Sequence, residues 1–297
     1  MGFLDALRSR TVIVLDGAMG TELSRRGHPD GPLCNLSAPE AVREVHLDYL
    51  RAGSAALTTN TLTMNRIYVG AHHVDVDVEK VNRAGASLAV SALEEYHARE
   101  TRYVLGNLSA TGQLLEPLGG FREEDFVSAY REQAGFLAEG GVDGFIIETI
   151  VDLREAVCAL RGCRQAAPKL PAIACLAFYT TGNGGRTAMG NSAEDCARVL
   201  SREGADAVGA NCGSLEPEQM AEIVRTMAGA AVLPVAVEPN AGIPRLVGGA
   251  TLYEMTPAVF ANGLLRCRAA GARVLGGCCG TTPEHIRALL RMLASAA

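Results

Sequence analysis

The sequence predicts a single (β/α)8 barrel of the TIM type, and three observations support this fold class. Short segments of continuously apolar residues alternate with longer segments of helical periodicity along the chain of 297 residues. Strands that are apolar on both faces are typical of parallel sheets covered by helices. Eight such units, in a chain longer than the roughly 250 residues that a barrel needs, close most simply into a barrel. No change of composition marks a linker, so the expected domain covers residues 1–297.

Each expected strand is a short apolar run that ends at a polar or turn-forming segment. The first run ends at Asp16-Gly17, the second at Asn60-Thr61 and the fourth at Glu148-Thr149. Runs of this length bounded in this way are typical of buried strands. The expected strands are Thr11–Leu15, Ala55–Thr59, Tyr103–Gly106, Gly144–Ile147, Ala172–Leu176, Ala207–Ala210, Val235–Val237 and Arg273–Leu275.

An amphipathic helix is expected after each strand. In the first helix Val42, Val45 and Tyr49 share one side, and the last helix begins with Thr282 as N-cap and Pro283 at the first helical position. The expected helices are Pro39–Arg51, Val78–Glu95, Glu124–Glu139, Asp152–Ala166, Ala193–Arg202, Pro217–Met227, Pro257–Ala269 and Pro283–Leu293.

Two glycine-rich segments are expected to be long connections within the barrel. Thr180–Arg186 lacks the Lys-Ser/Thr ending of a phosphate-binding loop, so we expect it to be a flexible lid over the site. The second segment is Gly242–Gly249. A doubly wound open sheet is the alternative fold, but Asp16–Thr21 lacks the Gly-x-Gly-x-x-Gly spacing of a dinucleotide-binding turn.

Composition excludes several classes of partner. A formal net charge of −6 gives no electrostatic reason to bind nucleic acid or an anionic membrane surface. No stretch approaches the ~18 apolar residues of a membrane span. The nine cysteines are odd in number and lack the spacing of a disulfide framework, which favours a reducing, cytoplasmic environment.

Cys212, Cys278 and Cys279 are the candidate metal ligands. Each follows an expected strand, and catalytic groups of a barrel gather at the C-terminal ends of its strands. Three thiolates favour Zn²⁺, and three protein ligands with an open fourth position are typical of catalytic zinc. The alternatives are ordinary buried cysteines, or a disulfide between Cys278 and Cys279, which adjacent residues rarely form. The other cysteines are expected to be packing residues: Cys34, Cys158, Cys163, Cys175, Cys196 and Cys267.

Three motifs resemble the homocysteine S-methyltransferase family. They are Asp16–Thr21, Gly209–Cys212 and Gly276–His285, and the similarity runs from about Leu15 to Leu290. The motif sequences are most similar to those of the homocysteine-binding module of cobalamin-dependent methionine synthase. The resemblance implies a barrel, zinc on the three cysteines, and methyl transfer to the thiol of L-homocysteine to give L-methionine.

Further polar residues stand at the expected strand ends. From the residues alone, Asp16 and Glu148 could face the ammonium group of an amino acid, cap a helix or support a ligand residue. The resemblance implies that both hold homocysteine. Glu238 either supports the barrel mouth or contacts a ligand, and Asn211 is expected to shape the turn that carries Cys212.

The methyl donor is the least determined part of the prediction. The family uses S-methylmethionine, betaine, S-adenosylmethionine or methylcobalamin, and a small sulfonium such as S-methylmethionine is expected because the chain shows no cobalamin or folate domain. One alternative is a subunit that exchanges methyl groups with a separate corrinoid protein. Another is a different small thiol, since Leu62 and Ser109-Ala110 depart from the family pattern. An alternative of another class is a metal-free barrel that binds a ligand or regulates a partner.

Overall fold

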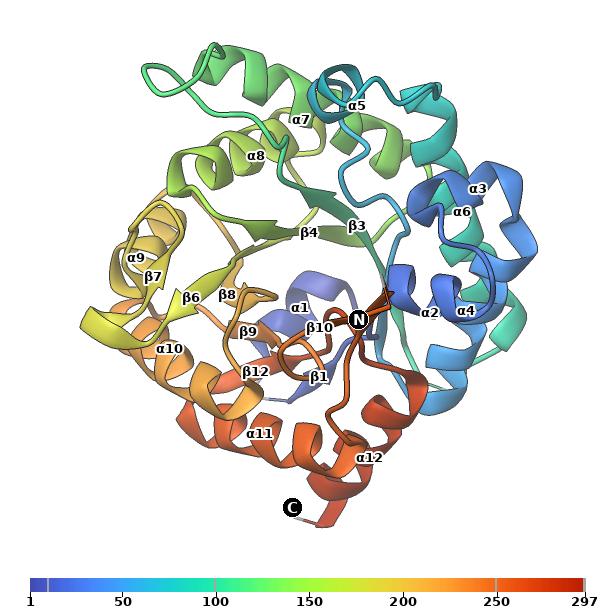
Figure 1. Cartoon of the computed structure of the whole chain (residues 1–297), viewed down its shortest axis with the longest axis vertical. Coiled ribbons are helices and arrows are strands. Elements are labelled where there is room, and N and C mark those ends of the chain that lie inside the picture. Colours follow the sequence, from blue (N-terminus) through green and yellow to red (C-terminus); the bar gives the residue numbers. More distant parts are fainter. Residues whose placement is uncertain (10, 99, 249, 296–297) are drawn as a thin grey trace.

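The computed structural model describes residues 1–9, 11–98, 100–248 and 250–295, and it confirms the predicted barrel. Eight parallel strands form one sheet in the order β1-β12-β9-β8-β5-β4-β3-β2 (Figure 1). A backbone hydrogen bond from Ala55 N to Val14 O (2.7 Å) joins the first and last strands of this order. The strands are β1 (Ile13–Val14), β2 (Ala56–Thr58), β3 (Tyr103–Ser109), β4 (Gly144–Ile150), β5 (Ala172–Leu176), β8 (Ala207–Asn211), β9 (Val235–Glu238) and β12 (Ala272–Leu275).

The eight expected helices surround the sheet, each within a few residues of its expected bounds (Figure 1). They are α4 (Pro39–Ala52), α6 (Val78–Tyr96), α7 (Glu123–Glu139), α8 (Leu153–Ala166), α9 (Ala193–Arg202), α10 (Pro217–Ala230), α11 (Pro257–Ala270) and α12 (Pro283–Ser295). Their apolar faces form the main core with the outward-facing strand residues, because a strand buried on both faces needs helices outside it. Within the described ranges, no helix combines the length and apolar character needed to cross a membrane.

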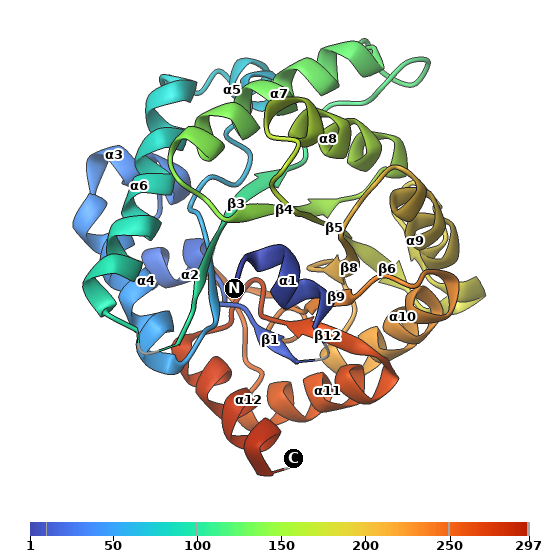
Figure 2. The same ribbon diagram turned by 180° about the vertical axis from the view of Figure 1, so that it is seen from behind.

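The helix α1 (Phe3–Arg8) was not expected, and it closes the N-terminal end of the barrel (Figure 2). Its buried residues Phe3, Ala6 and Leu7 pack with inward-facing strand residues in a second core cluster. The Phe3 ring lies 5.1 Å from the Tyr103 ring, centroid to centroid. Since α1 covers this end, ligands have access to the interior only from the C-terminal ends of the strands.

Short elements fill the loops that follow the strands. They are α2 (Met19–Arg25), η1 (Gly31–Leu33), α3 (Cys34–Ser37), α5 (Arg66–Ala71), β6 (Phe178–Thr180), η2 (Gly182–Gly184), β7 (Arg186–Thr187), β10 (Arg245–Val247) and β11 (Ala250–Leu252). The β6–β7 and β10–β11 pairs are antiparallel hairpins. Gly249, the last residue of the second expected connection, lies outside the described residues.

The position of the β6–β7 hairpin corrects the expected lid. A Cβ atom on Gly185 would lie 2.3 Å from Ile223 Cδ1, so this turn packs tightly against α10. Gly185 also has a φ of +77°, a conformation that favours glycine. The segment from Thr180 to Arg186 is thus held at the side of the barrel by pairing and packing.

Replacing Phe3 tests whether α1 seals the barrel. The Phe3→Ala variant should lose about 3–5 kcal/mol of unfolding free energy, because a buried ring is removed from the barrel end. Urea denaturation measures the loss, and Arg8→Ala, an exposed position of the same helix, is the control. A loss no larger than that of the control would contradict a sealing role for α1.

Candidate metal centre and substrate cavity

A cavity of about 250 Å³ opens at the C-terminal ends of the strands. Its wall combines the segment that leads into α2, the start of η1, the ends of several strands and the loop after β12. The lining residues are Gly17, Ala18, Met19, Gly20, Thr21, Gly31, Pro32, Thr58, Thr59, Asn60, Leu62, Asn107, Glu148, Thr149, Cys212, Glu238, Gly277, Cys278 and Cys279. No residue of the β6–β7 hairpin is among them.

The three predicted metal ligands meet in the wall of this cavity. The sulfur atoms of Cys212, Cys278 and Cys279 all lie within 4.8 Å of one another. A tetrahedral zinc ion with Zn–S bonds of about 2.3 Å holds its sulfur ligands about 3.8 Å apart, so the cluster fits such an ion after a small adjustment. The three side chains are partly exposed, so one face of the cluster is accessible from the cavity.

The backbone after β9 holds both cysteine segments in place. Cys212 N donates to Glu238 O (3.0 Å), and Cys278 N donates to Pro239 O (2.9 Å). Ala241 N donates in turn to Cys279 O (2.9 Å). Cys212 has a φ of +52°, a left-handed conformation that turns its side chain away from the direction of the strand. The chain therefore leaves extended geometry at Cys212.

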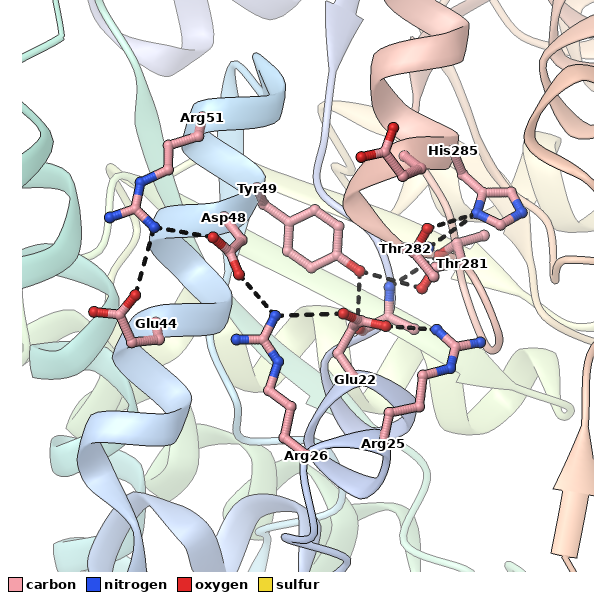
Figure 3. A network of polar contacts seen from close by, with 12 residues as sticks. Glu22, Arg25, Arg26, Glu44, Asp48, Tyr49, Arg51, Thr281, Thr282 and His285 are labelled. Carbon is pink, nitrogen blue, oxygen red and sulfur yellow. Dashed lines mark hydrogen bonds and ion pairs between the residues drawn. The ribbon is translucent and has the colours of Figure 1, made fainter.

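A hydrogen-bonded network fixes the loop that carries Cys278 and Cys279. Thr281 Oγ1 donates to Cys278 O (2.7 Å) and accepts from Ala18 N (3.0 Å). The buried Tyr49 hydroxyl lies within hydrogen-bond distance of two carbonyls, Ala18 O (2.9 Å) and Thr281 O (3.3 Å) (Figure 3). The network thus joins α4, the start of α2 and the metal loop.

Ion pairs on α2 extend this network toward the surface. Arg25 pairs with Glu22 and also donates to Gly280 O (3.1 Å), next to the candidate ligand Cys279. Arg26 pairs with Glu22 and with Asp48 of α4 (Figure 3). These contacts keep α2 against the metal loop, so the cavity wall on that side has a defined position.

The thiols interact with one another. Hydrogen bonds from Cys212 and then from Cys278 lower the pKa of Cys279, although burial opposes this shift, while the pKa of Cys278 is raised. Of the three thiols, Cys279 is therefore the one whose ionisation the cluster favours. A thiolate is the form of cysteine that binds metals.

Glu148, at the end of β4, lines the cavity as the strand-end prediction requires. Its carboxylate accepts from Asn107 Nδ2 (2.5 Å) and from Asn211 Nδ2 (3.0 Å). Burial raises its pKa to about 7, against the opposing effect of the Asn107 hydrogen bond. A positive group in the cavity would favour the ionised form of this carboxylate.

Asp16 lies in the same layer but faces β2. Its carboxylate accepts from Thr58 N (2.8 Å) and Thr58 Oγ1 (3.0 Å). The side chain is buried and its pKa is raised to about 8, chiefly by burial. Thr58 lines the cavity while Asp16 does not, so the two predicted acidic residues differ in their access to a ligand.

Glu238 adds a third carboxylate, and its role is clearer in the structure than in the sequence. Its Oε2 atom is buried without a hydrogen-bond partner, and so is Asn107 Oδ1. Burial first, and then the charges of Glu148 and Asp16, raise the Glu238 pKa. The described residues that line the cavity include no lysine or arginine. The cavity therefore offers unpaired acceptors and carboxyl groups whose ionisation is disfavoured until a partner binds, which suit a ligand with a positive group that donates hydrogen bonds.

Asn211, which was expected to shape the turn that carries Cys212, bonds through its side chain to the neighbouring strand end of β4. Its Oδ1 accepts from Thr149 N (2.7 Å), and its Nδ2 donates to Thr149 Oγ1 (2.8 Å). Thr149 has a φ of +60°, so the Asn211 side chain stabilises a strained turn directly after Glu148.

Comparison with known proteins identifies the family. The sequence model of the homocysteine S-methyltransferase family matches residues 13–293. The chain belongs to the homocysteine S-methyltransferase family. Methionine synthase of Mycobacterium tuberculosis is 32% identical over 98% of this chain and 25% of that protein. Methionine synthase of Mycobacterium leprae is 31% identical over 96% of this chain and 24% of that protein. The chain thus spans about a quarter of the length of these relatives.

Solved structures agree with this family assignment. The metallated form of the homocysteine methyltransferase MmuM from Escherichia coli has a TM-score of 0.78 at 27% identity, over 97% of this chain and 98% of that chain. Its oxidized form has a TM-score of 0.79 at 27% identity, over 98% of both chains. The carboxyl transferase domain of Rhizobium etli pyruvate carboxylase is 13% identical with a TM-score of 0.55, over 97% of this chain and 48% of that chain, and shares the fold alone.

In this member of the homocysteine S-methyltransferase family, the structure brings the predicted site residues together at one end of the barrel. The six cysteines expected to be packing residues are all buried. The roles of the Tyr49 and Thr281 hydroxyl groups could not be predicted from the sequence. Thr281 stands within the motif Gly276–His285, while Tyr49 belongs to a segment that is distant in sequence from the cysteines.

Proposed function

We propose that this protein is a zinc-dependent methyltransferase that transfers a methyl group to the thiol of L-homocysteine and releases L-methionine. The observation that carries the proposal is the cluster of three cysteine sulfur atoms in the wall of a cavity that also contains buried carboxylates. Membership in the homocysteine S-methyltransferase family and the likeness to MmuM support the acceptor.

Cys212, Cys278 and Cys279 would hold the zinc ion. When bound there, zinc supplies an open coordination position that takes up the acceptor thiol and deprotonates it at neutral pH. The acceptor sulfur then gives an electron pair to the methyl carbon, while the bond from that carbon to the donor breaks. The product is an uncharged thioether, a weaker ligand than a thiolate, and this difference favours release.

The carboxylates would orient the acceptor. Glu148 and Glu238 line the cavity, so their oxygens, with the unpaired Asn107 Oδ1, are placed to accept hydrogen bonds from the substrate ammonium group. Asp16 fixes Thr58 in the cavity wall. A bound ammonium would lower the raised pKa values of these groups and favour their ionised forms.

A small sulfonium such as S-methylmethionine is the donor that this cavity suits best. The carboxyl groups at the cavity favour a cationic donor, because a cation would stabilise their ionised forms. No aromatic residue is among the described residues that line the cavity, so it lacks the aromatic cage by which quaternary ammonium groups are usually bound. This difference favours a sulfonium over betaine.

A methylated corrinoid protein is the second candidate donor, and a separate observation favours it. Large apolar side chains are exposed in loops that follow strands of the barrel, among them Leu114, Leu118, Met189, Ile243 and Leu246. Exposed apolar side chains on the loops at the end of the barrel that carries the site would suit contact with a protein partner. The methionine synthase relatives are consistent with such a partner.

The first test concerns the metal. Purified protein should contain about one zinc ion per chain, and Cys212→Ala, Cys278→Ala and Cys279→Ala should each lose both zinc and turnover with an unchanged circular dichroism spectrum. Cys196→Ala, at a buried position of α9, is the matched control and should keep both. Full turnover in metal-free protein would refute the proposal and favour a metal-free barrel.

The second test concerns the acidic residues. Glu148→Gln should raise the KM for homocysteine, because loss of a charge-assisted contact costs about 1.5–3 kcal/mol. Asp16→Asn should also raise it, because Asp16 holds Thr58 in the cavity wall. Zinc content should stay unchanged, since neither residue is a proposed ligand. Glu94→Gln, an exposed position of α6, is the control. Acceptor kinetics equal to the control in both variants would assign these carboxylates a purely structural role.

The third test identifies the donor. Incubation of the purified protein with homocysteine and S-methylmethionine should form methionine without any other protein. A parallel reaction replaces S-methylmethionine by a methylated corrinoid protein. Methionine formed only in the parallel reaction would reject the small sulfonium and establish the second candidate.

A further inference from the structure

Two hydroxyl groups connect the metal loop, residues 277–281, to the segment beside it, residues 17–21. Thr281 Oγ1 accepts from Ala18 N (3.0 Å) and donates to Cys278 O (2.7 Å). The Tyr49 hydroxyl lies 2.9 Å from Ala18 O and 3.3 Å from Thr281 O, so one proton serves a carbonyl of each segment (Figure 3). In the first case a single oxygen atom separates the Ala18 amide from the carbonyl of a candidate metal ligand.

Glycine on both segments makes room for these hydroxyl groups. A Cβ atom on Gly17 would lie 2.6 Å from Thr281 Oγ1 and 2.9 Å from the Tyr49 hydroxyl, and a Cβ atom on Gly277 would lie 2.6 Å from Thr281 Oγ1. Gly17 and Gly277 both line the cavity, whereas Thr281 and Tyr49 are fully buried and do not. The two hydroxyl groups therefore lie directly behind the cavity wall.

Other bonds join the two segments near their ends. Gly277 N donates to Asp16 O (3.0 Å), and Gly280 N donates to Thr21 Oγ1 (3.2 Å). The contacts of Thr281 and Tyr49 lie between these points, at Ala18. The middle of the 17–21 segment thus has a defined distance from the metal loop, and this distance depends on two side-chain hydroxyl groups.

The proposed acceptor would have to contact both segments. Its thiol would bind the metal, and the rest of the molecule would lie against other parts of a cavity of about 250 Å³. Residues 17–21 form the longest continuous part of the lining and adjoin the metal loop. A ligand held at two ends gains affinity from its second contact only when the distance between the two contacts matches its length.

We propose that Thr281 and Tyr49 set the spacing between the bound metal and residues 17–21, and so match the cavity to the length of the acceptor. This inference rests on the proposed function. Both are positioning residues, because they act through the backbones of Ala18 and Cys278. Neither is among the described residues that line the cavity, so neither is expected to touch the acceptor.

Calorimetry with two ligands on zinc-loaded protein tests the spacing. L-Homocysteine would contact the metal and the wall, whereas L-norvaline, with a methyl group in place of the thiol, would contact the wall alone. Thr281→Val and Tyr49→Phe each remove a hydroxyl and keep the shape of the side chain. Each should raise the Kd of homocysteine about five-fold, as for one lost hydrogen bond, and change that of norvaline less than about two-fold.

Two further variants are the controls. Thr281→Ser keeps the hydroxyl and should bind both ligands as the native protein does. Thr226→Val removes a hydroxyl that bonds to Glu222 O within α10 (3.0 Å), away from the cavity, and should also bind both ligands as the native protein does.

The remaining outcomes would overturn the inference. Equal weakening of both ligands would mean that the hydroxyl groups support the wall without setting its distance from the metal. An unchanged Kd of homocysteine in both variants, or native protein that does not bind norvaline, would contradict it too. Loss of zinc from Thr281→Val would assign its hydroxyl to metal retention. If that variant does not fold, Tyr49→Phe decides.

A separate result would refute the proposed function itself. Native protein that binds no zinc, or that binds homocysteine equally well with and without zinc, would do so. The comparison of native protein with and without zinc therefore tests the proposed function, and the comparison of variants in the zinc-loaded state tests this inference.

Discussion

The backbone that follows β9 is the constraint on which the site depends. Glu238 O and Pro239 O accept hydrogen bonds from Cys212 N and Cys278 N, and Ala241 N donates to Cys279 O. The cysteines come from β8 and β12, which lie on either side of β9 in the sheet. One strand end therefore sets the spacing of two ligand segments that are far apart in sequence, and the closure of the barrel keeps the three strands in register.

The electrostatics of the site follow from the carboxyl groups that the barrel buries near the backbone after β9. Asp16, Glu148 and Glu238 are buried near the C-terminal ends of their strands, and burial raises the pKa of all three. Leaving carboxylates without a positive partner is unfavourable for the ligand-free protein. A substrate with an ammonium group relieves this cost on binding, so the same feature that strains the free protein would give affinity and orientation to an amino acid.

Much of the fold could be predicted from the sequence because the strands are apolar on both faces and the helices are amphipathic. The cysteines could be identified because strand ends meet in a barrel, which makes three distant positions neighbours. Residues of the supporting structure could not be found in this way. The helix α1 has six residues, too few for a clear period, and it forms because the barrel end offers an apolar surface. The β6–β7 segment has the composition of a mobile loop, but strand pairing and α10 fix it.

The two predicted acidic residues also show which features could not be predicted from the sequence. Glu148 extends from a strand into the cavity, which alternation along β4 allows one to expect, whereas the orientation of Asp16 is decided by the N–H and hydroxyl of Thr58 on the neighbouring strand. Tyr253 belongs to an irregular segment after β11, and its ring packs on Gly280 because glycine has no side chain there. Contacts of this kind depend on two residues that are distant in sequence. Neither residue alone forms a sequence pattern that predicts the contact.

The central claim is that the three cysteines present one metal ion to the thiol of the acceptor. X-ray absorption at the zinc edge tests it directly, because the technique counts the sulfur atoms bound to the metal. We expect three sulfur neighbours in the protein alone and four after L-homocysteine is added. A sulfur count that stays the same on addition of homocysteine, in protein that is active, would contradict the account.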